Sequence, residues 1–124
     1  RVDRIVLPGG MPGTVNLEAC APLMEQVEAF YRAGKDIAAI CAAPSILGHR
    51  GMLKGKKACS FPTFEEHLEG AEVTQNPVET ADNIITGRGM GCAIDFGLAI
   101  VGKLKGKEQA AVLAGNVVYK HYER

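Results

Sequence analysis

The sequence has little that would attract it to nucleic acid or to a membrane. Its 14 basic and 14 acidic residues cancel, so the chain has no net field to draw a polyanion or an anionic lipid surface. Pro44 and Asp95 interrupt the longest apolar runs well before the ~20 residues that a membrane-spanning helix requires. These absences exclude both classes of partner and favour a small or neutral ligand.

The chain also lacks the cysteine and histidine spacings of disulfide scaffolds and metal sites. Its four cysteines lie at least 18 residues apart without a C-x-x-C pair, and no secretory signal or N-glycosylation site is found. His49, His67 and His121 are far apart in sequence, with no H-E-x-x-H motif and no cysteine at metal spacing. We therefore expect a protein of the reducing cytoplasm, with surface histidines, no metal and no cofactor.

Nucleotide-binding loops are absent as well. The segment G-R-G-M-G at 87–91 does not have the offsets of G-x-G-x-x-G, and no G-K-[S/T] occurs for a P-loop. Arg88 is the only charge in this segment, where its guanidinium could bind a carboxylate or a phosphate. A structural salt bridge is an equally open interpretation of Arg88.

What the chain does have is an alternation of strand and helix patterns, with no repeat or linker to divide residues 1–124. Strand patterns occur at 5–7, 36–40, 58–61, 72–74, 78–80 and 84–86. Helical patterns occur between Pro22 at the start and Gly34 just past the end, just after Cys41, and briefly at 64–68. A further helix is expected at 94–101, with Ile94, Leu98 and Val101 on one face. A last one is expected at 112–122, supported by Val112, Val117, Val118 and Tyr122. This alternation predicts one α/β domain with a parallel sheet covered on both faces.

Cys41 is the most informative residue, because it lies at a predicted strand-to-helix turn. The strand at 36–40 leads straight into it, and Pro44 fits the first turn of the helix that follows. Such a strained turn exposes its side chain, and the unpaired N–H groups of the helix favour thiolate over thiol. A buried structural cysteine is the alternative, since free cysteine is among the most buried residue types.

Two glycine-rich segments are expected to meet Cys41. Ligands of such sheets bind at the carboxyl ends of the strands, and the segments at 8–13 and 87–91 each follow a predicted strand. The backbone amides of Gly9, Gly10 and Ala42 could then surround one pocket and stabilise an oxyanion as a carbonyl is attacked, an effect of about 3 kcal/mol per donor in hydrolases. This convergence favours a functional thiol at Cys41.

Three motifs resemble the DJ-1/ThiJ/PfpI family. They are V-L-P-G-G at 6–10, A-A-I-C-A-A-P at 38–44 and T-G-R-G-M-G at 86–91, the last followed by A-I-D-F-G-L at 93–98. The resemblance covers almost the whole chain and is nearest to the bacterial ThiJ-type, parkinsonism-associated deglycase branch. It implies a flavodoxin-like, three-layer α/β sandwich with a mostly parallel sheet, a homodimer and a reactive elbow cysteine.

The resemblance also assigns roles to individual residues. Cys41 matches the family nucleophile, and Gly9, Gly10 and Ala42 match positions whose backbone amides line its oxyanion site. Arg88 matches an arginine beside that pocket, where it would bind the substrate or another anion.

Two departures from the family bear on the chemistry. The protease-like branch has a histidine directly after its cysteine, whereas this chain has Ala42, so peptidase activity is disfavoured. Human-type relatives have a histidine before a proline of the following strand, whereas here Phe61 precedes Pro62. The family also implies an N-terminal strand-helix unit whose glutamate hydrogen-bonds the cysteine, and no such unit precedes the strand at 5–7. We therefore expect an incomplete domain, with the glutamate supplied by an N-terminal companion fragment.

Two functions remain open on these grounds. The first is a glyoxalase-like or deglycase-like enzyme in which Cys41 attacks a small α-oxoaldehyde or its adducts, without metal or glutathione. The second is an oxidative-stress redox sensor or chaperone that uses the same cysteine. Sequence does not separate them, because the pocket is identical in both.

Overall fold

A computed structural model describes residues 2–120 of the chain. Its elements, with η for 3₁₀-helices, are β1 (Arg4–Leu7), α1 (Gly13–Glu18), α2 (Ala21–Ala33), β2 (Asp36–Ile40), α3 (Pro44–His49), β3 (Lys57–Ala58), η1 (Pro62–His67), β4 (Glu72–Val73), β5 (Val78–Ala81), β6 (Ile84–Gly87), η2 (Met90–Cys92), α4 (Ala93–Lys105) and α5 (Lys107–Asn116). No helix in this part of the chain has the length and apolar content to cross a bilayer.

The main sheet has the strand order β1-β2-β6-β5. The first three strands are parallel, and β5 joins β6 as an antiparallel hairpin, so the sheet is mostly parallel as the sequence predicts. Strands β3 and β4 form a separate two-stranded parallel sheet. Because β1, β2 and β6 point the same way, the residues that follow them lie at one edge of the sheet.

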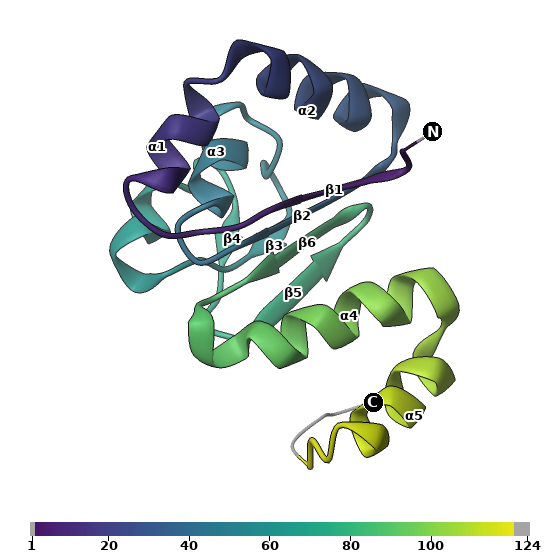
Figure 1. The fold of residues 1–124 in the computed structure, drawn as a ribbon. Coiled ribbons are helices and arrows are strands. Elements are labelled where there is room, and N and C mark those ends of the chain that lie inside the picture. The colour runs from purple at the N-terminus through teal and green to yellow at the C-terminus, as the bar shows by residue number, and fades with distance from the viewer. Residues whose placement is uncertain (1, 121–124) are drawn as a thin grey trace.

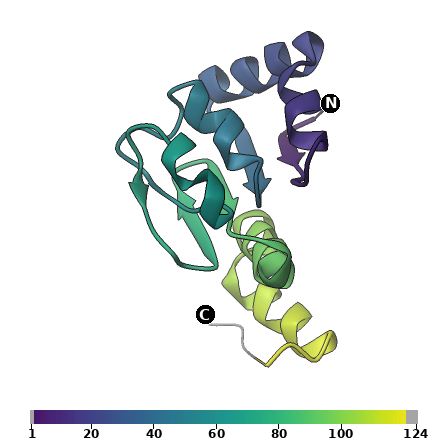
Figure 2. The same ribbon diagram turned by 90° about the vertical axis from the view of Figure 1, so that its left-hand side faces the viewer.

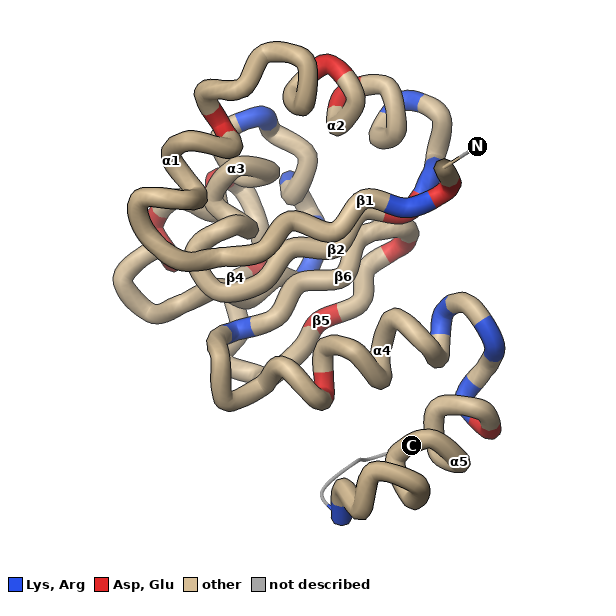
Figure 3. Tube along the Cα trace, viewed as in Figure 1, with Lys and Arg blue, Asp and Glu red and all other residues tan. Residues whose placement is uncertain are grey.

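Helices cover both faces of the sheet, which gives three layers (Figure 1). Helices α1, α2 and α3 lie on one side and α4 on the other, with α5 beyond α4 and away from the sheet (Figures 1 and 2). Acidic and basic residues are interspersed along the elements, in keeping with the balanced charge (Figure 3). The predicted α/β sandwich is therefore confirmed.

The side chains of β2 alternate between two cores of different size. Ile37 and Ala39 belong to a large buried cluster that includes Val27 of α2 and Ile46 of α3. Ala38 faces the other way, into a smaller cluster with Ile85 and Phe96. Larger apolar side chains thus fill the side that carries the segment after Cys41, which fixes α3 firmly against the sheet.

Helix α2 shows why the sequence signals at its ends were sufficient. Pro22 occupies its first turn, and Gly34 ends it in the left-handed conformation at φ 72°. The Lys35 amide donates to the carbonyl of Phe30 at 2.9 Å, which satisfies a carbonyl at the helix end. The predicted helix from Pro22 to Gly34 is confirmed.

Other predicted elements differ in extent. The strand expected at 58–61 is paired only at Lys57–Ala58, because the chain then leaves β4 to reach the turn at Cys41. Helix α5 ends at Asn116, so Val117 and Val118 lie beyond it, and Tyr122 lies outside the described residues. Ile94 does not share a buried face with Leu98, since 52% of Ile94 is exposed.

Helix α4 places Phe96, Ala99 and Ile100 in the cluster against the sheet instead. The predicted helix is therefore confirmed, but the face of Ile94, Leu98 and Val101 is not the one that packs against the sheet.

Candidate active site

Cys41 sits in a backbone conformation that a residue with a side chain rarely adopts. Its φ is 65°, and it follows β2 directly and precedes the turn into α3. A left-handed non-glycine residue costs on the order of 1–3 kcal/mol, so the surrounding structure must hold it there. Two hydrogen bonds do so: the Cys41 amide donates to the Gly87 carbonyl at 2.9 Å, and the Phe61 amide donates to the Cys41 carbonyl at 2.8 Å. The strained turn that the sequence predicts is present, and the Cys41 side chain is half-buried.

The first glycine segment is pressed against this turn. A Cβ atom added to Gly9 would lie 2.6 Å from the Cys41 Cβ and 2.7 Å from the Ile40 carbonyl oxygen. Only glycine allows such a close approach of the two backbones. The carbonyl of Gly10 accepts hydrogen bonds from the amide and the hydroxyl of Thr14, at 2.9 and 2.8 Å, which anchors this loop to the start of α1.

The backbone amides of Gly9, Gly10 and Ala42, which the sequence assigns to an oxyanion site, have no acceptor within residues 2–120. The amides of Met11 and Gly13 in the same loop have none either. Free N–H groups beside a cysteine can donate to a developing oxyanion or to an oxidised sulfur. The structure places Gly9 against the Cys41 turn, with Gly10 next in the chain, and the oxyanion role of the three amides remains a prediction.

The second glycine segment meets the turn from the other side. Gly87 closes β6, where a Cβ atom would lie 2.9 Å from side-chain atoms of Ile40 and Phe96. The next residue, Arg88, has its Nη2 atom 3.9 Å from Oε2 of Glu65 in η1. The Arg88 Nε and the Glu65 Oε2 are buried without a hydrogen bond in the described chain. Arg88 thus has a salt-bridge partner and keeps one unused donor, so anion binding by Arg88 remains a prediction.

No imidazole or carboxylate hydrogen-bonds the Cys41 sulfur within residues 2–120. Phe61, at the position where the family resemblance leads one to expect a histidine, is 44% exposed and lies near Gly89. His49 and His67 contact each other at the far end of α3. The described residues supply a thiol and amide donors, but no imidazole or carboxylate that is hydrogen-bonded to that thiol.

Cys59 is a second cysteine near this edge of the sheet, and its environment is different. It is fully buried, and its thiol donates to the Thr86 carbonyl at 3.4 Å. Burial is the main cause that raises the pKa of the Cys59 thiol, to about 11, although a hydrogen bond with the side-chain hydroxyl of Thr86 lowers it. Cys59 is therefore held as a neutral thiol.

Two residues near the site had no sequence signal of their own. Glu65 pairs with Arg88, and Thr86 accepts a hydrogen bond from the Cys59 amide at 3.1 Å. Glu65 lies in η1, close to the brief helix predicted at 64–68, but no periodicity could predict that η1 brings it beside Arg88. Thr86 lies in a predicted strand, but its role depends on a residue 27 positions away.

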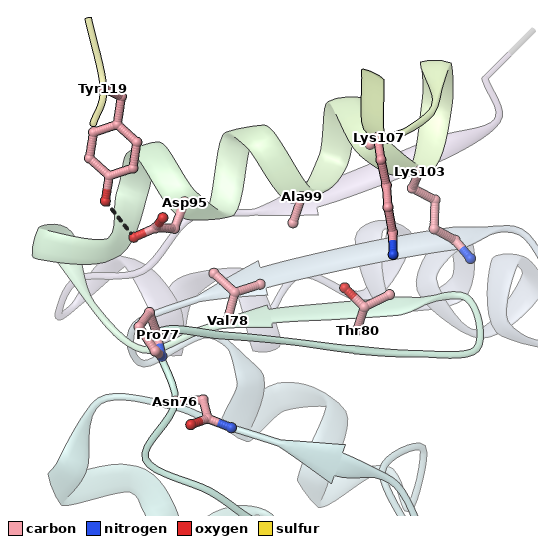
Figure 4. Close-up of a pocket in the computed structure, with 10 residues that line it drawn as sticks. Asn76, Pro77, Val78, Thr80, Asp95, Ala99, Lys103, Lys107 and Tyr119 are labelled. Atoms are coloured by element: carbon pink, nitrogen blue, oxygen red, sulfur yellow. Dashed lines mark hydrogen bonds between the residues drawn. The ribbon is translucent and has the colours of Figure 1, made fainter. Parts of the chain in front are cut away.

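A separate cavity of about 780 Å³ lies between β5 and α4, away from Cys41 (Figure 4). Asp95 and Tyr119 occupy one end, where the Tyr119 hydroxyl donates to Asp95 at 2.7 Å, and Lys103 and Lys107 occupy the other. The hydrogen bond to Asp95 is the main cause that raises the pKa of Tyr119. No residue of the Cys41 turn lines this cavity, so the cavity and its Tyr119 are separate from the thiol site.

The comparison with known sequences points to one family. The DJ-1/PfpI family model matches residues 1–103. The chain is 40% identical over 120 residues to Protein DJ-1 homolog B of Arabidopsis thaliana, which covers 95% of this chain and 27% of that protein. It is 33% identical over 108 residues to Glutathione-independent glyoxalase DJR-1.2 of Caenorhabditis elegans, covering 86% of this chain and 58% of that protein. The chain thus spans less than two thirds of the length of either relative.

Solved structures give the same result for the fold. Oxidized Toxoplasma gondii DJ-1 superposes with a TM-score of 0.91 at 34% identity, covering 98% of this chain and 66% of that one. Drosophila melanogaster DJ-1beta superposes with a TM-score of 0.87 at 32% identity, covering 95% and 64%. The flavodoxin-like fold is therefore confirmed. By its sequence, its three motifs and its fold, the chain belongs to the DJ-1/PfpI family.

Proposed function

We propose that this protein is a cysteine-dependent enzyme that converts small α-oxoaldehydes, or their adducts, without metal or glutathione. One observation carries the proposal: Cys41 is held in a strained turn with Gly9 pressed against it, and the amides of Gly9, Gly10 and Ala42 have no acceptor within the described chain. An enzyme that attacks a carbonyl needs this pairing of nucleophile and oxyanion donors. A nematode relative bears the name glutathione-independent glyoxalase, which supports the same class of substrate.

The reaction would begin with addition of the Cys41 thiolate to the aldehyde carbon of a substrate such as methylglyoxal. The new S–C bond forms as the carbonyl electrons move to oxygen, where the amides of Gly9, Gly10 and Ala42 donate hydrogen bonds. A base then takes the proton from the hemithioacetal carbon and returns it to the neighbouring carbonyl carbon, which gives a thioester. Water cleaves the C–S bond and releases lactate.

The base of this scheme is not at the turn in residues 2–120. We propose that the base is a carboxylate outside these residues, as the family resemblance implies. A carboxylate beside the thiol can form a hydrogen bond with it and can also carry the proton. The same resemblance leads us to propose a homodimer in the cytoplasm. Light scattering of the protein in solution checks the dimer, with a monomer at all concentrations contradicting it.

The test is the replacement of Cys41 by serine. Lactate formation from methylglyoxal should fall to background in Cys41→Ser, because a serine hydroxyl is not ionised at neutral pH. Cys20→Ser is the matched control, since Cys20 is an exposed cysteine at the start of α2, and it should retain activity. Undiminished turnover in Cys41→Ser would refute the assignment.

A redox sensor or chaperone is the second candidate, and the same thiol favours it. Oxidation of Cys41 to sulfinic acid would place two oxygens among the free amides of this turn, which could hold them. The similar Toxoplasma structure is described as oxidized. Mild peroxide followed by peptide mass analysis tests this function. If Cys41 gains no oxygen before Cys20, Cys59 and Cys92, selective sensing is wrong.

A further inference from the structure

Three residues that are distant in sequence form a hydrogen-bonded row at the ends of three helices. Glu18 ends α1, His49 ends α3 and His67 ends η1. The Nδ1 atom of His49 lies 2.8 Å from Oε2 of Glu18, and the Nε2 atom of His49 lies 2.9 Å from Nδ1 of His67. The two histidines are 18 residues apart in sequence, which is why their spacing along the chain suggested no site.

The carboxylate determines which nitrogen of His49 is free. An ionised carboxylate only accepts hydrogen bonds, so His49 carries its proton on Nδ1 and donates it to Glu18. In the neutral ring, Nε2 then has a lone pair and accepts the Nδ1 proton of His67 across 2.9 Å. A metal ion that replaced this proton, with the His67 proton moved to Nε2 of the same ring, would have two imidazole nitrogens as ligands at one point on the surface.

The spacing of the two rings suits a tetrahedral ion. Zn²⁺ binds imidazole nitrogen at about 2.0–2.1 Å, which puts two tetrahedral ligand nitrogens about 3.3 Å apart and their ring centroids about 5.2 Å apart. The observed ring centroids are 5.1 Å apart and the nitrogens 2.9 Å apart. The ring centroids have the required separation, but the nitrogens are closer than a shared ion requires, so both rings must turn away from their direct hydrogen bond toward the ion.

The backbone and the local charge also fit a cation. Gly48 lets η1 approach α3, since a Cβ atom there would overlap the carbonyl oxygen of His67. The exposed carboxylates of Glu66 and Glu69 flank His67 in sequence. The nearest basic neighbour in sequence, Arg50, is engaged with Glu28 at 3.0 Å. A divalent cation is therefore favoured over an anion at this point.

We propose that Nε2 of His49 and Nδ1 of His67 bind a divalent transition metal, with Zn²⁺ as the best fit. Glu18 is the positioning residue that orients His49 through its Nδ1 proton, as carboxylates do behind many metal-bound histidines. No three metal-binding side chains gather within residues 2–120, so water completes the coordination. The site shares no residue with the Cys41 turn and does not depend on the proposed function. It replaces the sequence-based expectation of no metal.

Calorimetric titration of the metal-free protein with zinc chloride tests this proposal, after the thiols are blocked with iodoacetamide to remove competing ligands. We expect one equivalent of zinc to bind the wild-type protein. His49→Asn and His67→Asn should each weaken binding by at least tenfold, and Glu18→Gln by about tenfold through the lost charge behind His49. Glu72→Gln removes an exposed carboxylate on β4 and should leave the affinity unchanged.

Nitrogen NMR of the wild-type histidine rings gives a second readout that requires no variant. Zinc should shift Nε2 of His49 and Nδ1 of His67, and the signal of the Nδ1 proton of His49 should persist because Glu18 still accepts it. Equal zinc affinity in the wild-type protein and both histidine variants would overturn the proposal. So would a wild-type protein whose histidine signals do not move at saturating zinc.

Discussion

Cys41 and Cys59 lie near the same edge of the fold, yet the structure gives them opposite properties. Cys41 is half-buried in a left-handed turn, and its neighbours offer free amides. Cys59 is fully buried in an extended segment, where its thiol donates to Thr86 and burial raises its pKa to about 11. The comparison indicates that the backbone conformation around a cysteine, more than the sheet edge it occupies, decides whether its sulfur is available for chemistry.

The largest effect is expected from closing the space beside Cys41. In Gly9→Ala, the new methyl group would lie 2.6 Å from the Cys41 Cβ, so either the turn or the loop must move. Misplacing the nucleophile relative to its donors should lower kcat/KM with methylglyoxal about 100-fold. Gly13→Ala is the matched control, because a Cβ atom at Gly13 meets open space. Equal activity in the two variants would show that the Gly9 contact does not position Cys41.

The next effect concerns Cys59 and the stability of the fold at alkaline pH. Its pKa is raised from 9.0 to about 11 in the folded protein, so the unfolded chain loses the thiol proton first as pH rises. This contribution to stability is complete below pH 9 and is lost between pH 9 and 11. The difference between the two pKa values corresponds to about 3 kcal/mol in all, of which about 2 kcal/mol is lost by pH 10.5. Urea unfolding at pH 8 and pH 10.5 measures the loss.

The loss of unfolding free energy between pH 8 and pH 10.5 should be about 2 kcal/mol smaller in Cys59→Ala than in the wild-type protein. Cys20→Ala serves as the control at an exposed cysteine and should keep the wild-type loss. If Cys59→Ala still lost as much unfolding free energy between pH 8 and pH 10.5 as the wild-type protein, the buried Cys59 thiol would not be the cause of the alkaline destabilisation.

The smallest effect distinguishes the two backbones directly. Cys41→Gly should be more stable than Cys41→Ala by about 1 kcal/mol, because glycine adopts φ 65° without the steric cost of a Cβ atom. At Cys59, whose φ is not positive, the order should reverse. Denaturant unfolding of the four variants measures whether the glycine or the alanine variant is more stable at each position. The same order of stability at both positions would show that Cys41 is not strained relative to Cys59.

The sequence was sufficient for the parts of this site that follow from regular structure. Apolar segments predicted β1, β2 and β6, and the rule that parallel strands share their carboxyl ends brought Gly9, Cys41 and Gly87 to one edge. Helix α2 was predictable because Pro22 and Gly34 act locally at its two ends. These predictions succeeded because each depends on neighbouring residues or on the direction of a strand.

The rest depends on contacts that local pattern does not encode. The Glu65 to Arg88 ion pair and the His49 to His67 contact both arise because η1 folds back on the turn and on α3. The sheet-facing side of α4 could not be predicted, because spacing alone cannot say which of two partners, the sheet or α5, a helix residue contacts. Such pairings are set by the packing of irregular segments and become visible only in three dimensions.

Cys41 is expected to be the reactive cysteine of this protein, and Cys59 is expected to be unreactive in the folded state. Iodoacetamide added to the native protein, with peptide mass analysis over time, measures the alkylation rate of each cysteine separately. We expect Cys41 to react faster than Cys20 and Cys92, and Cys59 to react only after the protein unfolds. Alkylation of Cys59 in the native protein at a rate equal to that of Cys41, or a Cys41 slower than Cys20, would contradict the account.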